Sequence, residues 1–123
     1  MFVITEDKSI YLTRGDSVVI DVSAKISLEE NYIFTKNDIV TFKVMQKGKC
    51  EEIVLKKEIL IEQNTEMVTF ELTKEDTKLG EIINKPKDYW YEIELNSETD
   101  PKTIIGYDED GPKIFRIYPE GGE

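Results

Sequence analysis

The amino-acid sequence predicts an all-β fold, an antiparallel β-sandwich that forms a single domain over residues 1–123. Short runs in which apolar and polar residues alternate recur along the whole chain, and this period of two is typical of half-buried strands. Turn-forming Gly, Asn and Asp residues separate many of the runs. The length of 123 residues suits one hydrophobic core, because two cores in a chain of this size would each be marginal.

The first half of the chain is expected to hold four strands, at residues 8–13, 17–26, 39–46 and 51–62. The third run alternates cleanly, and Lys47-Gly48-Lys49 supplies the turn of a hairpin that joins it to the fourth. Residues 53–61 also fit a short helix, but their Ile and Val content favours a strand.

Two connections between these predicted strands, at residues 14–16 and 27–38, contain recognisable sequence patterns. Arg14-Gly15-Asp16 is the tripeptide that integrins read in matrix proteins, but its glycine and aspartate also suit a turn, and we interpret it as a turn. Residues 27–38 lack the alternation and are expected to form a loop or a short crossing strand. Within them, Tyr32, Ile33 and Phe34 make an apolar island that should fold back onto the core.

The second half begins with a predicted strand at residues 67–73. Thr73-Lys74-Glu75-Asp76 then has the form of a capping box, which predicts one short helical turn that ends at Gly80. The run 88–96 has the most regular alternation and is expected to be a central strand. Its core-facing residues would be Tyr89, Tyr91, Ile93 and Leu95, with Trp90, Glu92 and Glu94 on the other face.

The last two strands are predicted at residues 103–107 and 113–118. The turn-forming residues 108–111 between them predict a closing hairpin, and residues 119–123 are expected to fray. Seven to eight short strands with one helical turn and no long helical period are typical of an immunoglobulin-like β-sandwich.

The composition argues against several classes of protein. With 16 basic and 26 acidic residues, the formal charge of −10 would repel nucleic acid and anionic lipid. The apolar runs are shorter than the roughly 20 residues of a membrane-spanning helix, and the N-terminus lacks signal-peptide features, so we expect a cytoplasmic product with no nucleic-acid or membrane partner. Cys50 is the single cysteine and histidine is absent, so neither an internal disulfide, a cofactor nor a histidine-based active site is expected.

Two acidic groups invite a chemical interpretation. Asp108 and Asp110 lie close together in a turn, but they supply too few oxygens for a calcium loop, so we expect a solvated turn. Glu92 and Glu94 could be the acid and base of a glycosidase, yet carboxylates are common on the solvent-exposed face of a sheet without any catalytic role. We therefore expect a protein that is not an enzyme.

Four segments follow one another in a recognisable order along the chain. They are Ile10-Tyr11-Leu12-Thr13-Arg14-Gly15-Asp16-Ser17, Lys36-Asn37-Asp38-Ile39-Val40-Thr41-Phe42, Leu72-Thr73-Lys74-Glu75-Asp76-Thr77-Lys78-Leu79 and Tyr89-Trp90-Tyr91-Glu92-Ile93-Glu94-Leu95. Their order resembles that of small tail and baseplate proteins from phages and prophages of Gram-positive bacteria, and the resemblance covers residues 10–117. The chain differs from the family pattern in two respects, because Asn37 replaces a glycine and residues 81–87 lengthen a loop.

The resemblance implies an immunoglobulin-like structural module, comparable to the N-terminal domain of baseplate upper proteins, that becomes part of a virion. Its partners would be other phage structural subunits or a second copy of itself. Trp90 is the predicted interface anchor, although it would equally suit the second face of the sandwich core or a place under the long loop, and Tyr32 and Phe34 are further interface candidates. The alternative is a carbohydrate- or peptide-binding module, with Tyr32, Phe34, Tyr89 or Tyr107 as stacking surfaces.

Overall fold

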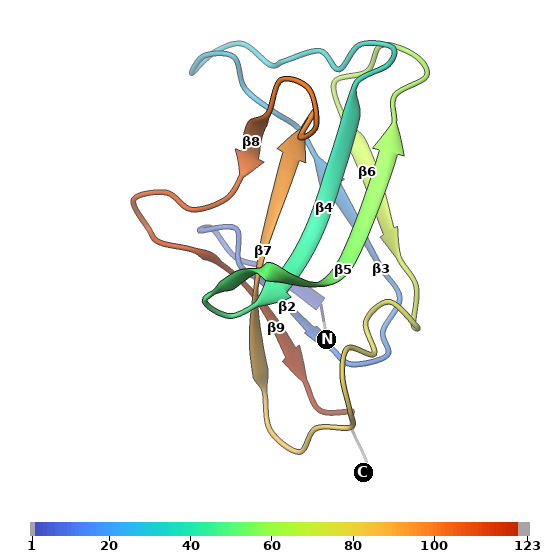
Figure 1. Cartoon of the computed structure of the whole chain (residues 1–123), viewed down its shortest axis with the longest axis vertical. Coiled ribbons are helices and arrows are strands. Elements are labelled where there is room, and N and C mark those ends of the chain that lie inside the picture. Colours follow the sequence, from blue (N-terminus) through green and yellow to red (C-terminus); the bar gives the residue numbers. More distant parts are fainter. Residues whose placement is uncertain (1, 121–123) are drawn as a thin grey trace.

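The computed structural model describes residues 2–120, and within that range it contains nine strands and no helix (Figure 1). The all-β prediction is confirmed. The nine described strands exceed the upper end of the predicted seven to eight by one, because the sequence pattern did not reveal the first strand. In chain order they are β1 (Phe2–Ile4), β2 (Ile10–Thr13), β3 (Val18–Val22), β4 (Ile39–Gln46), β5 (Lys49–Leu60), β6 (Val68–Leu72), β7 (Lys87–Leu95), β8 (Lys102–Ile105) and β9 (Lys113–Tyr118).

The strands form two sheets of unequal size. The larger sheet has seven strands in the order β1-β2-β9-β7-β4-β5, with β8 paired to β7, and the smaller sheet consists of β3 and β6. Phe42 on β4 and Phe70 on β6 meet between the sheets, with ring centroids 5.6 Å apart. The molecule is therefore two-layered, with one core between the layers.

Burial follows the period of two that the sequence predicts. On β3 and β6 every second residue is buried and the intervening residues are exposed. On β7 the side chains of Tyr89, Tyr91, Ile93 and Leu95 are all buried in the core. β7 is also central, because it pairs with β4 on one side and with β8 and β9 on the other. Both predictions for this strand are confirmed.

Two predicted pairings are wrong. The sandwich is not purely antiparallel, because β2 and β9 run parallel, with Ile10 opposite Phe115. β8 and β9 do not pair with each other as a hairpin; both pair with β7, β8 near its end and β9 near its start. The turn at Asp108 to Gly111 does form, with reciprocal backbone hydrogen bonds of 3.2 and 2.9 Å. It connects β8 and β9, which pair with successive parts of β7.

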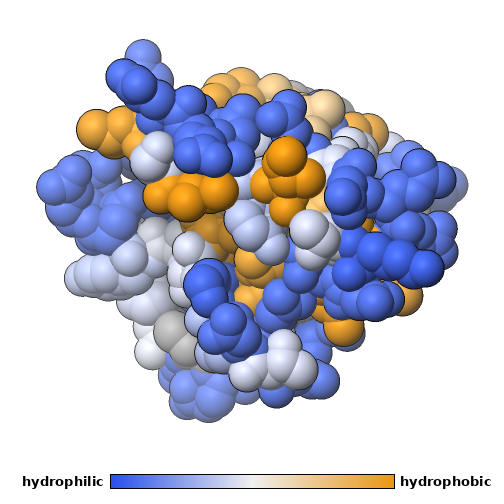
Figure 2. Space-filling model, turned by 90° about the horizontal axis from the view of Figure 1, so that it is seen from above, coloured by the Kyte–Doolittle hydropathy of each residue, from blue (hydrophilic) through white to orange (hydrophobic). Residues whose placement is uncertain are grey.

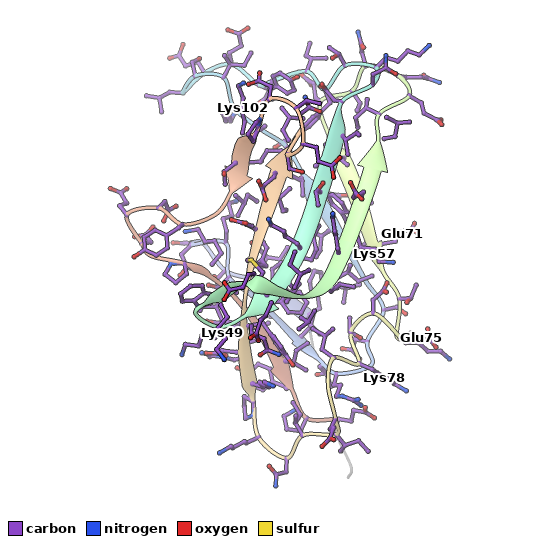
Figure 3. All side chains as sticks on the ribbon, viewed as in Figure 1. Lys49, Lys57, Glu71, Glu75, Lys78 and Lys102 are labelled. Carbon is purple, nitrogen blue, oxygen red and sulfur yellow. The ribbon has the colours of Figure 1, made fainter. Side chains whose placement is uncertain are left out.

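The predicted capping box forms its hydrogen bonds without a helix. The Thr73 amide donates to Asp76 Oδ2 at 2.8 Å, and the Asp76 amide donates to Thr73 Oγ1 at 3.2 Å. The segment is a turn over residues 74–77 only, short of the predicted end at Gly80, where the chain bends with a φ of +66°. A single turn has few intrahelical hydrogen bonds to offset the cost of fixing its backbone. Lys57 of β5, which Figure 3 labels, also pairs with Asp76 at 2.7 Å, so the turn is held against the larger sheet.

The Arg14-Gly15-Asp16 segment is a turn, as interpreted. Gly15 has a φ of +88°, a region that favours glycine. Its amide donates to the buried Thr77 hydroxyl at 3.0 Å, and that hydroxyl donates to the Asp16 carbonyl at 2.8 Å. Arg14 pairs with Glu120 at 2.8 Å. Of the tail predicted to fray, Glu120 thus has a partner, whereas residues 121–123 lie outside the described part of the chain, as does the side chain of Cys50.

We predict that Thr77→Val lowers the free energy of unfolding by about 1–3 kcal/mol, because it leaves the Gly15 amide and the Asp16 carbonyl without their partner. Urea denaturation of the purified protein measures the change. Thr77→Ser keeps the hydroxyl and is the control, with a smaller loss. Equal stability of Thr77→Val and the wild type would contradict the clamping role of this hydroxyl.

Candidate binding surfaces

The segments 24–38 and 61–67 close one end of the molecule together. The Phe34 amide donates to the Thr65 carbonyl at 2.8 Å, and the Asn37 amide donates to the Ile61 carbonyl at 2.9 Å. The predicted apolar island folds onto the core in part: Phe34 is fully buried, Tyr32 packs against the core at its edge, and Ile33 points outward. Phe34 therefore offers no accessible surface in this conformation.

Asp38 fixes the shape of this end. Its carboxylate accepts hydrogen bonds from the Tyr32 hydroxyl at 2.7 Å, the Thr35 amide at 2.9 Å and the Asn96 side chain at 3.0 Å. Burial alone would raise the pKa of Asp38, but these hydrogen bonds outweigh it and lower the pKa below its ordinary value. Asn37 precedes it with a φ of +81°, a left-handed conformation that asparagine adopts more readily than most other residues.

Large apolar side chains are exposed on these closing loops. The most exposed is Leu28, at 99%. Figure 2, which looks onto this end, shows apolar atoms gathered in several places among hydrophilic ones. We call this surface the loop-end patch and define it by five residues, Ile26, Leu28, Ile33, Leu60 and Met67.

A second apolar feature lies on the outer face of the larger sheet. Trp90 sits there between Met45 of β4 and Ile114 of β9, its direct cross-strand neighbours. Met45 is only 2% exposed although it is not part of the main core. The Trp90 indole N–H is buried without a hydrogen-bond partner. Trp90 is thus only partly accessible, and it belongs to a small apolar layer outside the main core.

Ion pairs occupy most of the charged groups around Trp90. Lys43 pairs with both Glu92 and Glu94; burial would lower the pKa of Lys43, but these carboxylates raise it. Arg116 binds Asp88 through two contacts of 2.6 and 3.1 Å and lies 4.9 Å from the Tyr11 ring centroid. The hydrogen bonds from Arg116 lower the pKa of Asp88. Glu92 and Glu94 therefore share a lysine rather than standing as an isolated acid and base.

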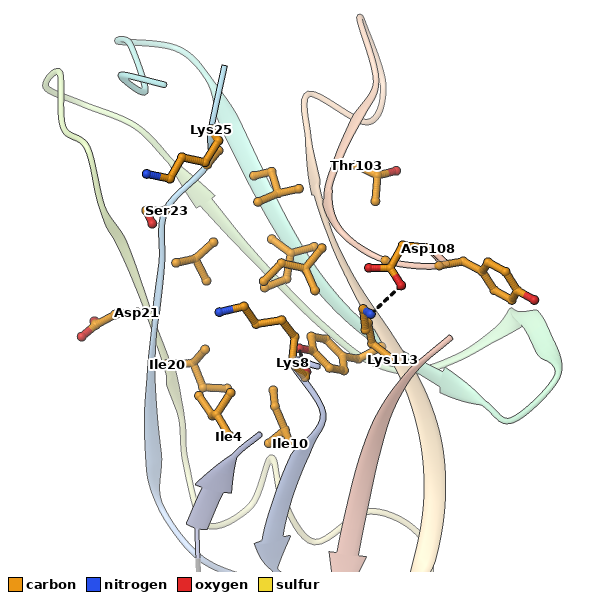
Figure 4. Close-up of a pocket in the computed structure, with 18 residues that line it drawn as sticks. Ile4, Lys8, Ile10, Ile20, Asp21, Ser23, Lys25, Thr103, Asp108 and Lys113 are labelled. Atoms are coloured by element: carbon orange, nitrogen blue, oxygen red, sulfur yellow. Dashed lines mark hydrogen bonds and ion pairs between the residues drawn. The ribbon is translucent and has the colours of Figure 1, made fainter. Parts of the chain in front are cut away.

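A cleft of about 600 Å³ opens on one side of the molecule, between β3 and the larger sheet (Figure 4). One wall is the run of residues 20–25, and the facing wall comes from β7, β8 and residues 106–108. At one side, Lys113 is 4% exposed and binds Asp108 at 2.8 Å. Lys113 therefore occupies the carboxylate that suggested a calcium loop, and residues 2–120 contain no cluster of three metal-ligating acidic or sulfur side chains.

The three predicted interface residues do not form one surface. Tyr32 and Phe34 are in edge-to-face contact, 5.3 Å between ring centroids, whereas Trp90 lies on the outer sheet face. The sequence analysis did not find the cleft, because its walls come from segments far apart in the chain. The loop-end patch did leave a signal, since Ile26 and Leu28 are large apolar residues beside a polar loop.

Comparisons of the chain with protein-family models, with curated proteins and with solved structures give no match. Among residues 2–120 the structure has no helix with the length and apolar character needed to cross a bilayer.

We predict that Trp90→Ala lowers the free energy of unfolding by about 1–3 kcal/mol, because the substitution uncovers Met45. The loss is smaller than that for a fully buried tryptophan, since Trp90 is partly accessible. Thermal melting and oligomeric mass are measured together. Tyr107→Ala, which truncates an aromatic side chain that is 76% exposed, is the control and should leave the melt unchanged. An unchanged melt with a smaller assembly would instead identify Trp90 as an interface anchor.

A second prediction concerns Asp88 and acid. Because its folded pKa is lowered, its contribution to stability is complete above the unfolded pKa of about 3.9 and is lost as pH falls through the folded value. Asp88→Asn should cost about 0.5–1 kcal/mol at pH 7, a value that allows for solvent screening. The cost should shrink towards pH 2 in urea titrations. Asp100→Asn, in an exposed ion pair with Lys102, is the control; a pH-independent difference for Asp88→Asn would contradict the linkage.

Proposed function

We propose that this chain is a non-catalytic structural or assembly module of a phage or prophage tail or baseplate, built on an immunoglobulin-like sandwich. The observation that supports it best is the loop-end patch, where five large apolar side chains are exposed on the closing loops and at the adjoining end of β5, and hydrogen bonds hold these loops together. Exposed apolar side chains gathered at one end of a molecule are a feature of many interaction sites.

The strand order supports the immunoglobulin-like part of the proposal. In the variable-type form of that fold, one sheet has neighbouring strands in the order G-F-C-C′, and strands B and E lie in the opposite sheet. Here β9, β7, β4 and β5 are neighbours in that order, and β3 and β6 form the other sheet. Their order along the chain, β3-β4-β5-β6-β7-β9, also follows B-C-C′-E-F-G.

The state of the charged groups supports a role without catalysis. Glu92 and Glu94 are engaged with Lys43, and Asp108 with Lys113. A general acid or base needs a position from which it can reach a substrate in a pocket. These carboxylates are instead neutralised by lysines at the sheet surface or the cleft margin.

The alternative of a carbohydrate- or peptide-binding module receives uneven support. Aromatic side chains stack on sugars only where they are accessible, but Phe34 and Tyr89 are buried in the core. Tyr107 is exposed and borders the cleft, without the other three aromatic candidates beside it. The cleft favours the peptide form of the alternative over the carbohydrate form.

The proposal predicts that tail particles purified from the host bacterium after prophage induction contain this chain, as measured by mass spectrometry. The double variant Leu28→Glu/Met67→Glu should enter the particles at no more than about a tenth of the wild-type level, because it puts charges into an apolar contact. Ile82→Glu is the matched control, since Ile82 is 83% exposed in the separate loop 80–86 and should be incorporated normally.

Circular dichroism checks that all three proteins are equally folded. The absence of the wild-type chain from particles that contain the other tail proteins would overturn the assignment to a tail. Normal incorporation of the double variant would overturn the role of the loop-end patch while leaving the assignment intact.

A further inference from the structure

We propose that the cleft beside β3 binds an extended, acidic peptide segment of another protein, which adds a third strand to the β3–β6 sheet. This inference concerns a surface other than the loop-end patch and does not depend on the assignment to a phage. Three features of the cleft carry it: a free strand edge, an apolar floor and two lysines without carboxylate partners.

The first feature is the edge of β3. β3 pairs with β6 on one side, and among residues 2–120 no strand pairs with it on the other. In an antiparallel pair, successive residues direct their backbone N–H and C=O groups alternately to the two sides, so about half of these groups on β3 point away from β6. Residues 20–25 line the cleft, and the first three of them belong to β3, whereas the Ala24 carbonyl already accepts a hydrogen bond from the Tyr32 amide at 2.9 Å and Lys25 forms an isolated bridge with Asn31. Over residues 20–22 the wall is therefore a strand edge, whose natural complement is another strand.

The second feature is the floor. The seven-stranded sheet is wider than the two-stranded sheet that faces it, and on the β3 side its inner surface continues into the cleft. The partly accessible side chains there are Ile4, Ile104 and Ile105, and the buried Ile20, Val22 and Ile93 lie beneath them as part of the core. An added strand would direct every second side chain towards this floor. A two-stranded sheet is also marginal by itself, and a third strand would extend its cover of the core.

The third feature is charge. Lys8 extends into the cleft and Lys25 lies at its rim (Figure 4). Both are exposed, and neither forms an ion pair with another residue in the range 2–120, although the protein has a formal charge of −10. The nearby acidic groups are engaged elsewhere: Asp108 binds Lys113, Asp7 accepts hydrogen bonds from Thr5 and Ser9, and Asp21 accepts one from Thr69 on the outside of β3.

Together these features select one occupant. A small ligand would leave the edge of β3 unpaired, and a second copy of this acidic chain would bring net repulsion. A segment with β-branched residues at alternate positions and carboxylates near both ends would satisfy the edge, the floor and the two lysines. About six residues suffice, since a strand advances about 3.3 Å per residue along the wall.

The test uses a fluorescein-labelled peptide, acetyl-Glu-Val-Thr-Ile-Thr-Val-Glu-amide, with fluorescence polarisation to measure affinity and hydrogen exchange by NMR to locate binding. We expect saturable binding that slows exchange of amides within residues 19–25. The double variant Lys8→Glu/Lys25→Glu should weaken binding at least about tenfold. Lys36→Glu/Lys85→Glu changes the net charge equally at exposed sites outside the cleft, and it should change affinity less than about twofold.

Two altered peptides separate the contributions. Replacing both glutamates of the peptide with lysine should weaken binding as strongly as Lys8→Glu/Lys25→Glu does. N-methylation of alternate backbone amides of the peptide should abolish binding for the set of amides that faces β3 and not for the set that faces away. No binding of the acidic peptide at 1 mM to folded protein would overturn the proposal, as would protection at β1 instead of β3. Protection of residues 19–25 in concentrated protein alone, reversed by dilution, would identify a second copy as the occupant and would also overturn it.

Discussion

The packing of Phe42 against aromatic rings from three other strands holds the two sheets together. Its ring lies 5.6 Å from Phe70 of the smaller sheet, 5.5 Å from Tyr91 in a stacked arrangement and 6.1 Å from Phe115 edge-on. Aromatic pairs add about 0.5–1.5 kcal/mol each beyond the burial of their apolar area. Phe70 is the smaller sheet's only ring in this group, and it packs there together with the apolar residues of β3 and β6 that share the core.

The parts of the fold that depend on local pattern could be predicted from the sequence. The bounds of β4 match the predicted run 39–46, and β7 differs from its predicted run by one residue at each end. Both strands have long, regular alternation that no competing signal interrupts. β1 escaped prediction because its three residues, Phe2, Val3 and Ile4, are all apolar and all exposed, so they carry no period of two.

Strand pairing was less predictable because it is not local. The turn at residues 108–111 has the residues of a hairpin turn and forms its own hydrogen bonds. Its local sequence does not indicate that both flanking strands, β8 and β9, pair with β7. The parallel pairing of β2 with β9 joins segments about 100 residues apart. The candidate sites differ in the same way. Leu28 is an apolar residue within a polar loop, which is a local signal in the sequence, whereas the cleft forms only where the fold brings β3 close to β8.

The unequal size of the two sheets explains why the molecule is closed on one side and open on the other. On the β6 side, β5 lies close to β6, and the ion pair from Lys57 to Asp76 bridges the sheets beside it. On the β3 side the larger sheet continues through β8 and β1, and no strand described in residues 2–120 covers that extension. Natural sheets commonly protect a free edge with charged side chains, above all lysine. Lys8 and Lys25 lie at this open side, and in the proposed complex their charge favours an acidic strand over a neutral one.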